Sequence, residues 1–177
     1  MDQITIDSIF KRFDESMPQK YVKKILDARI YDLALETPVE KAPLLSQRFN
    51  NNILLKREDL QPVFSFKVRG AYNKLRCLSD AQRSAGVIAA SAGNHAQGLA
   101  LAAKKMNVNA TIVMPVTTPE IKVDAVRSRG ANVVLIGDNY DAAATHANQL
   151  VQEQGLTYIH PFDLSLIHIS EPTRRRG

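Results

Sequence analysis

A lysine stands between two apolar residues at the start of a predicted helix, in the segment Ser65–Ala71. The positive end of a helix dipole disfavours a second cation there, by about 0.3–1 kcal/mol. The neighbours Phe66 and Val68 reduce hydration, so both effects favour the neutral, nucleophilic form of the Lys67 amine. Such an amine can condense with an aldehyde cofactor. Because most lysines are simply solvated, this segment alone is a weak indication.

The second segment that could bind a ligand is Ser91–Gly98. It follows a predicted strand and opens a predicted helix, and ligands of open α/β sheets bind at the carboxyl ends of strands. Free backbone N–H groups at a helix start bind carboxylate or phosphate. Ser91 adds a hydroxyl, Asn94 adds an amide, and Gly93 lets a ligand approach the backbone. Helix capping by Ser91 or Asn94 is the alternative interpretation, and it is compatible with binding.

Two further polar residues of this segment have open roles. His95 could carry a proton, although a buried, hydrogen-bonded histidine is the more frequent case. Gln97 could reach a ligand or line the first turn of the helix.

Other catalytic signatures are absent from the sequence. It contains no P-loop, HExxH, CxxC, nucleophile-elbow or GxGxxG pattern, so we expect no metal site and no dinucleotide fingerprint. The single cysteine, Cys77, cannot form an internal disulfide, which favours a reducing cytoplasm. We interpret Cys77 as a residue of a helix face.

The elements that must position these segments alternate along the chain. Short β-branched runs predict strands, and stretches of helical periodicity predict helices. Predicted strands cover residues 87–90, 111–114, 133–136 and 158–160, and predicted helices cover residues 67–77, 96–106, 120–128 and 142–154. The strand spacing of about 22–25 residues suits crossover helices between parallel neighbours. Gly86, Gly130 and Gly155 follow helical stretches, as left-handed C-caps do. The pattern predicts an open three-layer α/β unit with a mostly parallel sheet and flanking helices.

The N-terminal part is less regular. Residues 1–18 are polar and predicted to be a mobile lead-in, and residues 19–35 have the spacing of a helix that Thr37-Pro38 ends. The apolar runs 42–45 and 53–55 flank Asn50-Asn51-Asn52, which predicts a β-hairpin.

The composition excludes two classes of partner. The net charge of +5 includes +2 from residues 164–177, and the rest is dispersed, so no nucleic-acid surface is predicted. No apolar run approaches the roughly 20 residues of a membrane span. Residues 164–177 resemble a translated sequencing adaptor, and we expect them to be a non-native tail.

Taken together, the segments resemble those of a known enzyme family. Ser65–Ala71 is similar to the cofactor-lysine motif, and Ser91–Gly98 to the substrate-carboxylate loop, of the pyridoxal-phosphate (PLP) enzymes of the tryptophan-synthase-β-like fold, fold type II. Lys56–Asp59, Ile121–Arg127 and His160–Asp163 resemble threonine dehydratases of the biosynthetic type. The similarity runs collinearly over residues 19–163, the expected N-terminal part of the catalytic domain.

The resemblance implies a role for each site residue. Lys67 would bind the cofactor as a Schiff base and later carry a proton, Phe66 would pack against the pyridine ring, and Asn94 would bind its phenolic oxygen. The substrate carboxylate would be held by a set of loop residues: Ser91, Ala92, Gly93, Asn94, His95 and Gln97. The implied reaction converts L-threonine, and also L-serine, to a 2-oxo acid and ammonia as the first step of isoleucine biosynthesis. A cytoplasmic homo-oligomer, a tetramer in the full-length form, is implied as well.

One part of the family's cofactor site is expected to lie outside this chain, and two alternative functions stay open. The family's glycine-rich phosphate loop is expected beyond residue 163, so the 177-residue chain alone is expected to bind PLP poorly, to be inactive and to aggregate. One alternative keeps the fold and changes the substrate, as in serine dehydratases, serine racemases or cysteine-synthase relatives. The other is a non-catalytic α/β module that binds a small anion through residues 91–97.

Overall fold

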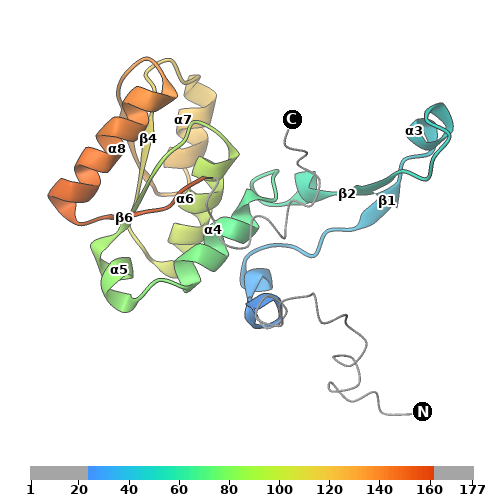
Figure 1. Cartoon of the computed structure of the whole chain (residues 1–177), viewed down its shortest axis with the longest axis horizontal. Helices are drawn as coiled ribbons and strands as arrows, with labels where there is room; N and C mark the ends of the chain where they lie inside the picture. The colour runs from blue at the N-terminus through green and yellow to red at the C-terminus, as the bar shows by residue number, and fades with distance from the viewer. Residues whose placement is uncertain (1–23, 162–177) are drawn as a thin grey trace, which may run out of the picture.

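The body of the molecule is a four-stranded parallel sheet with helices on both faces. We describe a computed structural model, which covers residues 24–161 of the chain (Figure 1). The strands are β3 (Val87–Ala90), β4 (Ala110–Met114), β5 (Asn132–Leu135) and β6 (Thr157–Tyr158). Their order in the sheet is β5-β4-β3-β6, and every pairing is parallel. The predicted α/β architecture is confirmed.

The central strand β3 is buried on both faces, as a continuous apolar strand of a parallel sheet should be. Successive side chains of a strand point to opposite faces. Val87 and Ala89 therefore enter one hydrophobic cluster, and Ile88 and Ala90 enter another.

The two clusters are closed by different helices. α4 (Lys67–Arg76), α6 (Asn94–Met106) and α7 (Glu120–Arg127) cover the first face, where they contribute the buried Leu75, Leu99 and Val126. α8 (Tyr140–Gln154) covers the second face with Ala143 and Ala147. Figure 1 shows α8 on the opposite side of the sheet from α6 and α7. The chain thus changes face between the helix that follows β3 and the helix that precedes β6.

The predicted element boundaries in this part are close to the observed ones. α6 and α8 each begin two residues earlier than predicted, and β6 ends at Tyr158 rather than His160. Gly155 is a left-handed C-cap with φ 68°, as expected. α5 (Asp80–Ala85) was not predicted, because six residues give little periodicity, although its Ser79–Gln82 capping box is a recognisable sequence signal.

Residues 36–57 form an arm that extends away from the body (Figure 1). β1 (Val39–Lys41) pairs antiparallel with β2 (Leu54–Lys56), and α3 (Pro43–Arg48) lies between them. The predicted hairpin is therefore correct in its pairing, but the prediction of a strand at residues 42–45 is wrong. Pro43 has a φ suited to the first turn of a helix and lacks the N–H that a ladder needs, so it begins α3 instead.

The helix predicted for residues 19–35 is interrupted. Residues 24–27 are helical, but Arg29 leaves the helical region, and a separate 3-10 turn, η1 (Ile30–Asp32), follows. The side chain of Gln61 binds both the N–H and the carbonyl oxygen of Leu35, which fixes this segment in a non-helical path. Tertiary hydrogen bonds thus override the local periodicity.

The predictions for residues 1–18 and 164–177 lie outside the described residues. No helix in the range 24–161 has the length and apolar character required to span a membrane.

Candidate active site

The two predicted segments meet at the carboxyl ends of β3 and β6. The Nζ atom of Lys67 donates to the carbonyl oxygen of Pro161 at 3.2 Å, and Nε2 of His95 lies 3.0 Å from the carbonyl oxygen of Ile159. Because β3 leads to α6 on one face while β6 arrives from α8 on the other, this edge is a topological switch point, where open α/β sheets bind ligands.

Gly98 explains how the two segments come so close. A Cβ atom built on Gly98 would lie 3.1 Å from the carbonyl carbon of Lys67 and 3.1 Å from the nitrogen of Val68. Only a residue without a side chain lets α6 approach the first turn of α4 this closely. The sequence analysis gave Gly98 no role, and the available signal was a glycine within a predicted helix.

Lys67 is the first residue of α4 and is half-buried. Its N–H donates to the Ser65 hydroxyl oxygen at 3.2 Å, and its Nζ lies 5.3 Å from the centre of the Phe66 ring. Val68 is fully buried in a separate small cluster with Ala34 and Val63. The backbone of Lys67 is therefore held by Ser65 before it and by the buried Val68 after it, and the ring of Phe66 lies beside its amine.

The start of α6 presents open hydrogen-bond donors. The N-cap is Gly93, and no side chain caps it. Ser91 instead accepts a hydrogen bond from the Gly93 N–H at 3.3 Å, and Asn94 is an exposed first residue of the helix, so neither side chain caps α6. Within residues 24–161, the N–H groups of Asn94, His95 and Ala96 have no acceptor, whereas that of Gln97 bonds to Gly93. Such a terminus suits an anion.

His95 is 3% exposed and belongs to the interior. Burial lowers its pKa to about 4, despite the opposing hydrogen bond to Ile159, and the nearby charges of Lys67 and His160 lower it further. A neutral imidazole that donates through Nε2 leaves Nδ1 as an acceptor, and Nδ1 has no partner among the described residues. This environment favours the buried, hydrogen-bonded role over that of a proton carrier.

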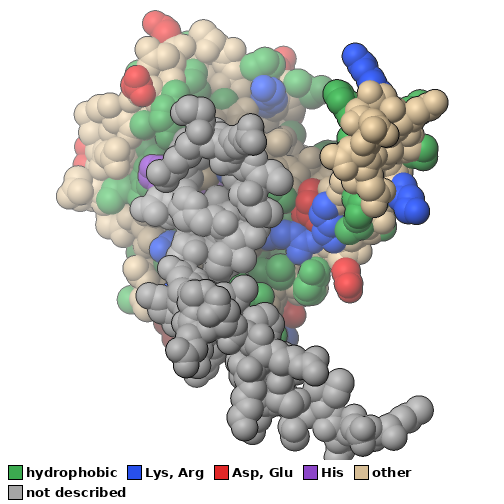
Figure 2. Space-filling model, turned by 45° about the vertical axis from the view of Figure 1, so that its right-hand side comes forward, with side chains coloured by type: hydrophobic (Ala, Val, Ile, Leu, Met, Phe, Trp, Pro, Cys, Tyr) green, Lys and Arg blue, Asp and Glu red, His purple; other side chains and the backbone are tan. Residues whose placement is uncertain are grey.

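An ion pair behind Lys67 holds the first turn of α4. Arg69 donates from Nε and Nη2 to the two oxygens of Glu58, each at 2.8 Å. Glu58 also accepts from Thr37 at 2.6 Å and from Gln61 at 3.2 Å. Burial alone would raise the pKa of Glu58, but these hydrogen bonds and the Arg69 charge lower it overall. Figure 2 shows basic and acidic side chains gathered where the arm meets the body.

The sequence analysis included Glu58 and Arg69 in its motifs without assigning them a role. Their distance along the chain hid the pairing, since only the fold brings η2 (Glu58–Leu60) against α4. Through Thr37, the pair links the base of the arm to the helix that carries Lys67.

An α/β unit with a half-buried lysine and an open helix N-terminus at the switch point fits an enzyme that holds an aldehyde coenzyme and an anionic substrate. The family described as "Pyridoxal-phosphate dependent enzyme" matches residues 30–172. The chain belongs to this family, and its predicted fold type II resemblance and PLP dependence are confirmed.

Within this family, the chain is similar in sequence to threonine dehydratases. The chain is 55% identical over 144 residues to threonine dehydratase 1 biosynthetic, chloroplastic, of Solanum lycopersicum, covering 81% of this chain and 24% of that protein. It is 56% identical over 146 residues to the biosynthetic L-threonine dehydratase of Burkholderia multivorans, covering 81% and 29%. The chain thus spans about a quarter of the length of these relatives.

Solved structures agree with the sequence comparison. The processed form of threonine deaminase isoform 2 from Solanum lycopersicum superposes with a TM-score of 0.80 at 53% identity, covering 85% of this chain and 42% of that one. Maize serine racemase superposes with a TM-score of 0.76 at 30% identity, covering 86% and 50%.

The described residues fit the coenzyme of the family in two respects. The amine of Lys67 lies at a helix start beside the Phe66 ring, a position that suits a link to an aldehyde. The three open N–H groups of α6 face the same edge of the sheet and can hold an anionic group.

Proposed function

We propose that the whole protein dehydrates and deaminates L-threonine to 2-oxobutanoate and ammonia, as the first step of isoleucine biosynthesis. The observation that carries the proposal is the meeting of Lys67 with the start of α6 at the switch point. The names of the most similar relatives, which are biosynthetic threonine dehydratases, support the same reaction.

Each site residue has a proposed part in this reaction. Lys67 holds the coenzyme and exchanges a proton with the substrate Cα, because its Nζ is fixed at the edge of the sheet by Pro161. Phe66 packs against the coenzyme ring, and Asn94 donates to the ring oxygen. Bound PLP supplies an electron sink for the pair left at Cα.

The substrate carboxylate is proposed to bind the loop that opens α6. The backbone N–H groups of residues 94–96 are its donors, and Gly93 has open space where a side chain would stand. Ser91, Ala92 and Gln97 are half-buried around this turn. Neutral His95 shapes the loop by its bond to Ile159.

A different substrate is the competing proposal. Maize serine racemase has the same fold at 30% identity, and one methyl group is worth only about 1–3 kcal/mol of discrimination. The non-catalytic anion-binding module has less support, since the residues around Lys67 serve no purpose in it.

The assay compares L-threonine with L-serine, using the whole protein with PLP. We expect release of 2-oxobutanoate from threonine at a higher kcat/KM than release of pyruvate from serine, and no release by Lys67→Ala. The 177-residue chain alone is expected to release neither. Equal activity of the Lys67→Ala variant would contradict the proposed role, and racemisation without ammonia release would favour the competing substrate class.

We also propose a homotetramer in the cytoplasm, from the family resemblance and the single cysteine. The plant and yeast relatives are named as chloroplastic and mitochondrial, so the location depends on the host. Light scattering of the whole protein measures the assembly directly, and a monomer would contradict it.

A further inference from the structure

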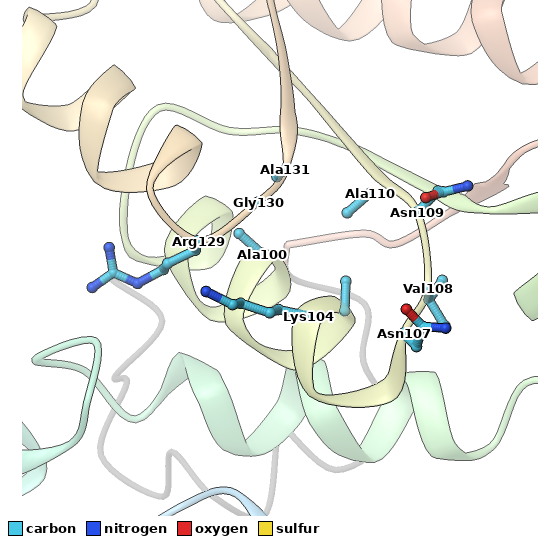
Figure 3. A pocket seen from close by; sticks show the side chains of 10 residues that line it. Ala100, Lys104, Asn107, Val108, Asn109, Ala110, Arg129, Gly130 and Ala131 are labelled. Atoms are coloured by element: carbon cyan, nitrogen blue, oxygen red, sulfur yellow. The ribbon is translucent and has the colours of Figure 1, made fainter.

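A cavity of about 190 Å³ lies between the last turns of α6 and the chain segments that enter β4 and β5 (Figure 3). Its lining includes Lys104 of α6, residues 107–110 and residues 129–131. These residues lie at the amino ends of the strands, whereas Lys67 and Ser91 lie at the carboxyl ends. A 13-residue helix is about 20 Å long, so the two ends of α6 serve separate regions.

The cavity carries an uncompensated positive charge. Lys104 and Arg129 line it, and none of the ten lining residues is acidic. The side chain of Lys104 makes no hydrogen bond or ion pair with any residue in the range 24–161. Among the described residues, Arg129 donates only to backbone carbonyl oxygens, those of Ala125 and Pro62. By contrast, Arg127 in the neighbouring helix has an acidic partner, Asp124.

Small residues leave the interior of the cavity open. Its walls include four alanines and one glycine: Ala100, Ala103, Ala110, Ala131 and Gly130. Gly130 has φ +86° and nothing within 4 Å of the place where a side chain would stand. In Figure 3 the basic side chains extend to one side, and the amides of Asn107 and Asn109 lie on the other.

We propose that this cavity binds a small organic anion that carries a carboxylate or phosphate group. Lys104 and Arg129 supply the charge that attracts the anion, and the asparagine amides hydrogen-bond its polar remainder. A volume of about 190 Å³ far exceeds the roughly 10–15 Å³ that a single water molecule needs, so the cavity has room for a metabolite the size of an amino acid.

The cavity is physically connected to the candidate active site by two routes. α6 carries Lys104 near its end and Gly98, which touches Lys67, in its second turn. Arg129 donates to the carbonyl oxygen of Pro62 at 3.4 Å, in the loop that leads to Ser65 and Lys67. An anion that draws Arg129 inward would therefore act on this loop.

The test is an NMR titration of the complete 177-residue chain, at a concentration at which light scattering finds it monomeric, with sodium acetate and with sodium phosphate, each against sodium chloride of equal ionic strength. We expect saturable shifts of the amides of Lys104, Gly130 and Ala131 with one or both oxyanions. Saturation with acetate alone identifies a carboxylate site, and saturation with phosphate alone identifies a phosphate site.

Lys104→Met, which keeps the apolar stem, is expected to weaken this binding at least tenfold, and Lys105→Met is the matched control. The dispersion of each variant's spectrum reports whether it is folded, and Lys104→Gln replaces a variant that is not. Shifts that rise linearly, that chloride reproduces, or that Lys104→Met leaves unchanged would overturn the proposal. Because Lys67 is not involved, failure here leaves the proposed dehydratase reaction untouched.

Discussion

Gly98 of α6 lies directly against the backbone of Lys67 in α4, with 3.1 Å between the place of an added Cβ and the Lys67 carbonyl carbon. The contact joins residues 31 positions apart, and it determines how near the lysine stands to the open N–H groups of the loop before α6. The neighbour is backbone rather than a flexible side chain, so two helices must move if Gly98 acquires a side chain.

Substitution of Gly98 tests this packing. Alanine gains about 1 kcal/mol of helix propensity but costs about 1–3 kcal/mol of overpacking, so Gly98→Ala should lower the free energy of unfolding by about 1 kcal/mol. Gly98→Val should cost more than Gly98→Ala. Gly93→Ala, in the same segment but with nothing within 4 Å, is the control: it loses only the N-cap preference of glycine over alanine and should cost less than Gly98→Val. Urea unfolding measures all three, and a stabilised Gly98→Val would contradict the contact.

Much of the body could be predicted because periodicity reports burial. The strand at residues 87–90 is a short, wholly apolar run in a parallel sheet, and its bounds are those observed. The structure of the arm was harder to predict. The apolar run at residues 42–45 fits a strand as well as a helix, and it is helical here because Pro43 begins α3. The Arg69–Glu58 pair could not be predicted, since a contact between a residue of η2 and a residue of α4 depends on tertiary geometry.

The Arg69–Glu58 pair predicts a loss of stability on neutralisation. Glu58→Gln leaves a largely buried guanidinium without its counter-ion, which should cost about 2–3 kcal/mol at pH 7. Asp59→Asn, next in the chain but in an exposed pair with Arg57, should cost less than about 1 kcal/mol. Equal losses in the two variants, measured by urea unfolding, would show that burial of the pair is unimportant.

The same pair predicts that the stability of the fold decreases at acid pH. The pKa of Glu58 is lowered in the folded state, so the unfolded chain binds its proton first as pH falls. The contribution of Glu58 to stability is therefore present above its unfolded pKa of about 4.3, and it is lost as pH falls through its folded pKa. Glu58→Gln should flatten the stability curve in this range, and a curve parallel to that of the original chain would contradict the prediction.

The burial of His95 predicts a second pH dependence of stability, at a higher pH than that of Glu58. Its folded pKa of about 4 lies below the unfolded value of about 6.5, so the unfolded chain binds the proton between these values. Stability should fall by about 3 kcal/mol as pH drops from 6.5 to 4, since the charged imidazole is excluded from the interior. His95→Gln should remove this slope, with His146→Asn on the exposed face of α8 as control. A His95 imidazole that NMR finds protonated at pH 6 would contradict it.

The arm predicts self-association of the 177-residue chain. It carries large apolar side chains with 40% or more of their surface exposed, namely Val39, Leu44, Leu45, Phe49, Leu54 and Leu55. Figure 2 shows hydrophobic side chains on the surface of this projection. Exposed apolar patches promote association. We expect light scattering to rise with concentration, and to rise less in the double variant Leu44→Lys with Phe49→Lys than in the control Ile121→Lys. A monodisperse monomer at high concentration would refute this expectation.

The central claim is that the coenzyme binds to the amine of Lys67, and chemical trapping tests this claim most directly. The whole protein is incubated with PLP, reduced with borohydride, digested and analysed by mass spectrometry. We expect the reduced coenzyme on the peptide that contains Lys67, and no labelled peptide from Lys67→Ala. Label on another lysine, such as Lys56 or Lys74, or no label at all, would contradict the assignment.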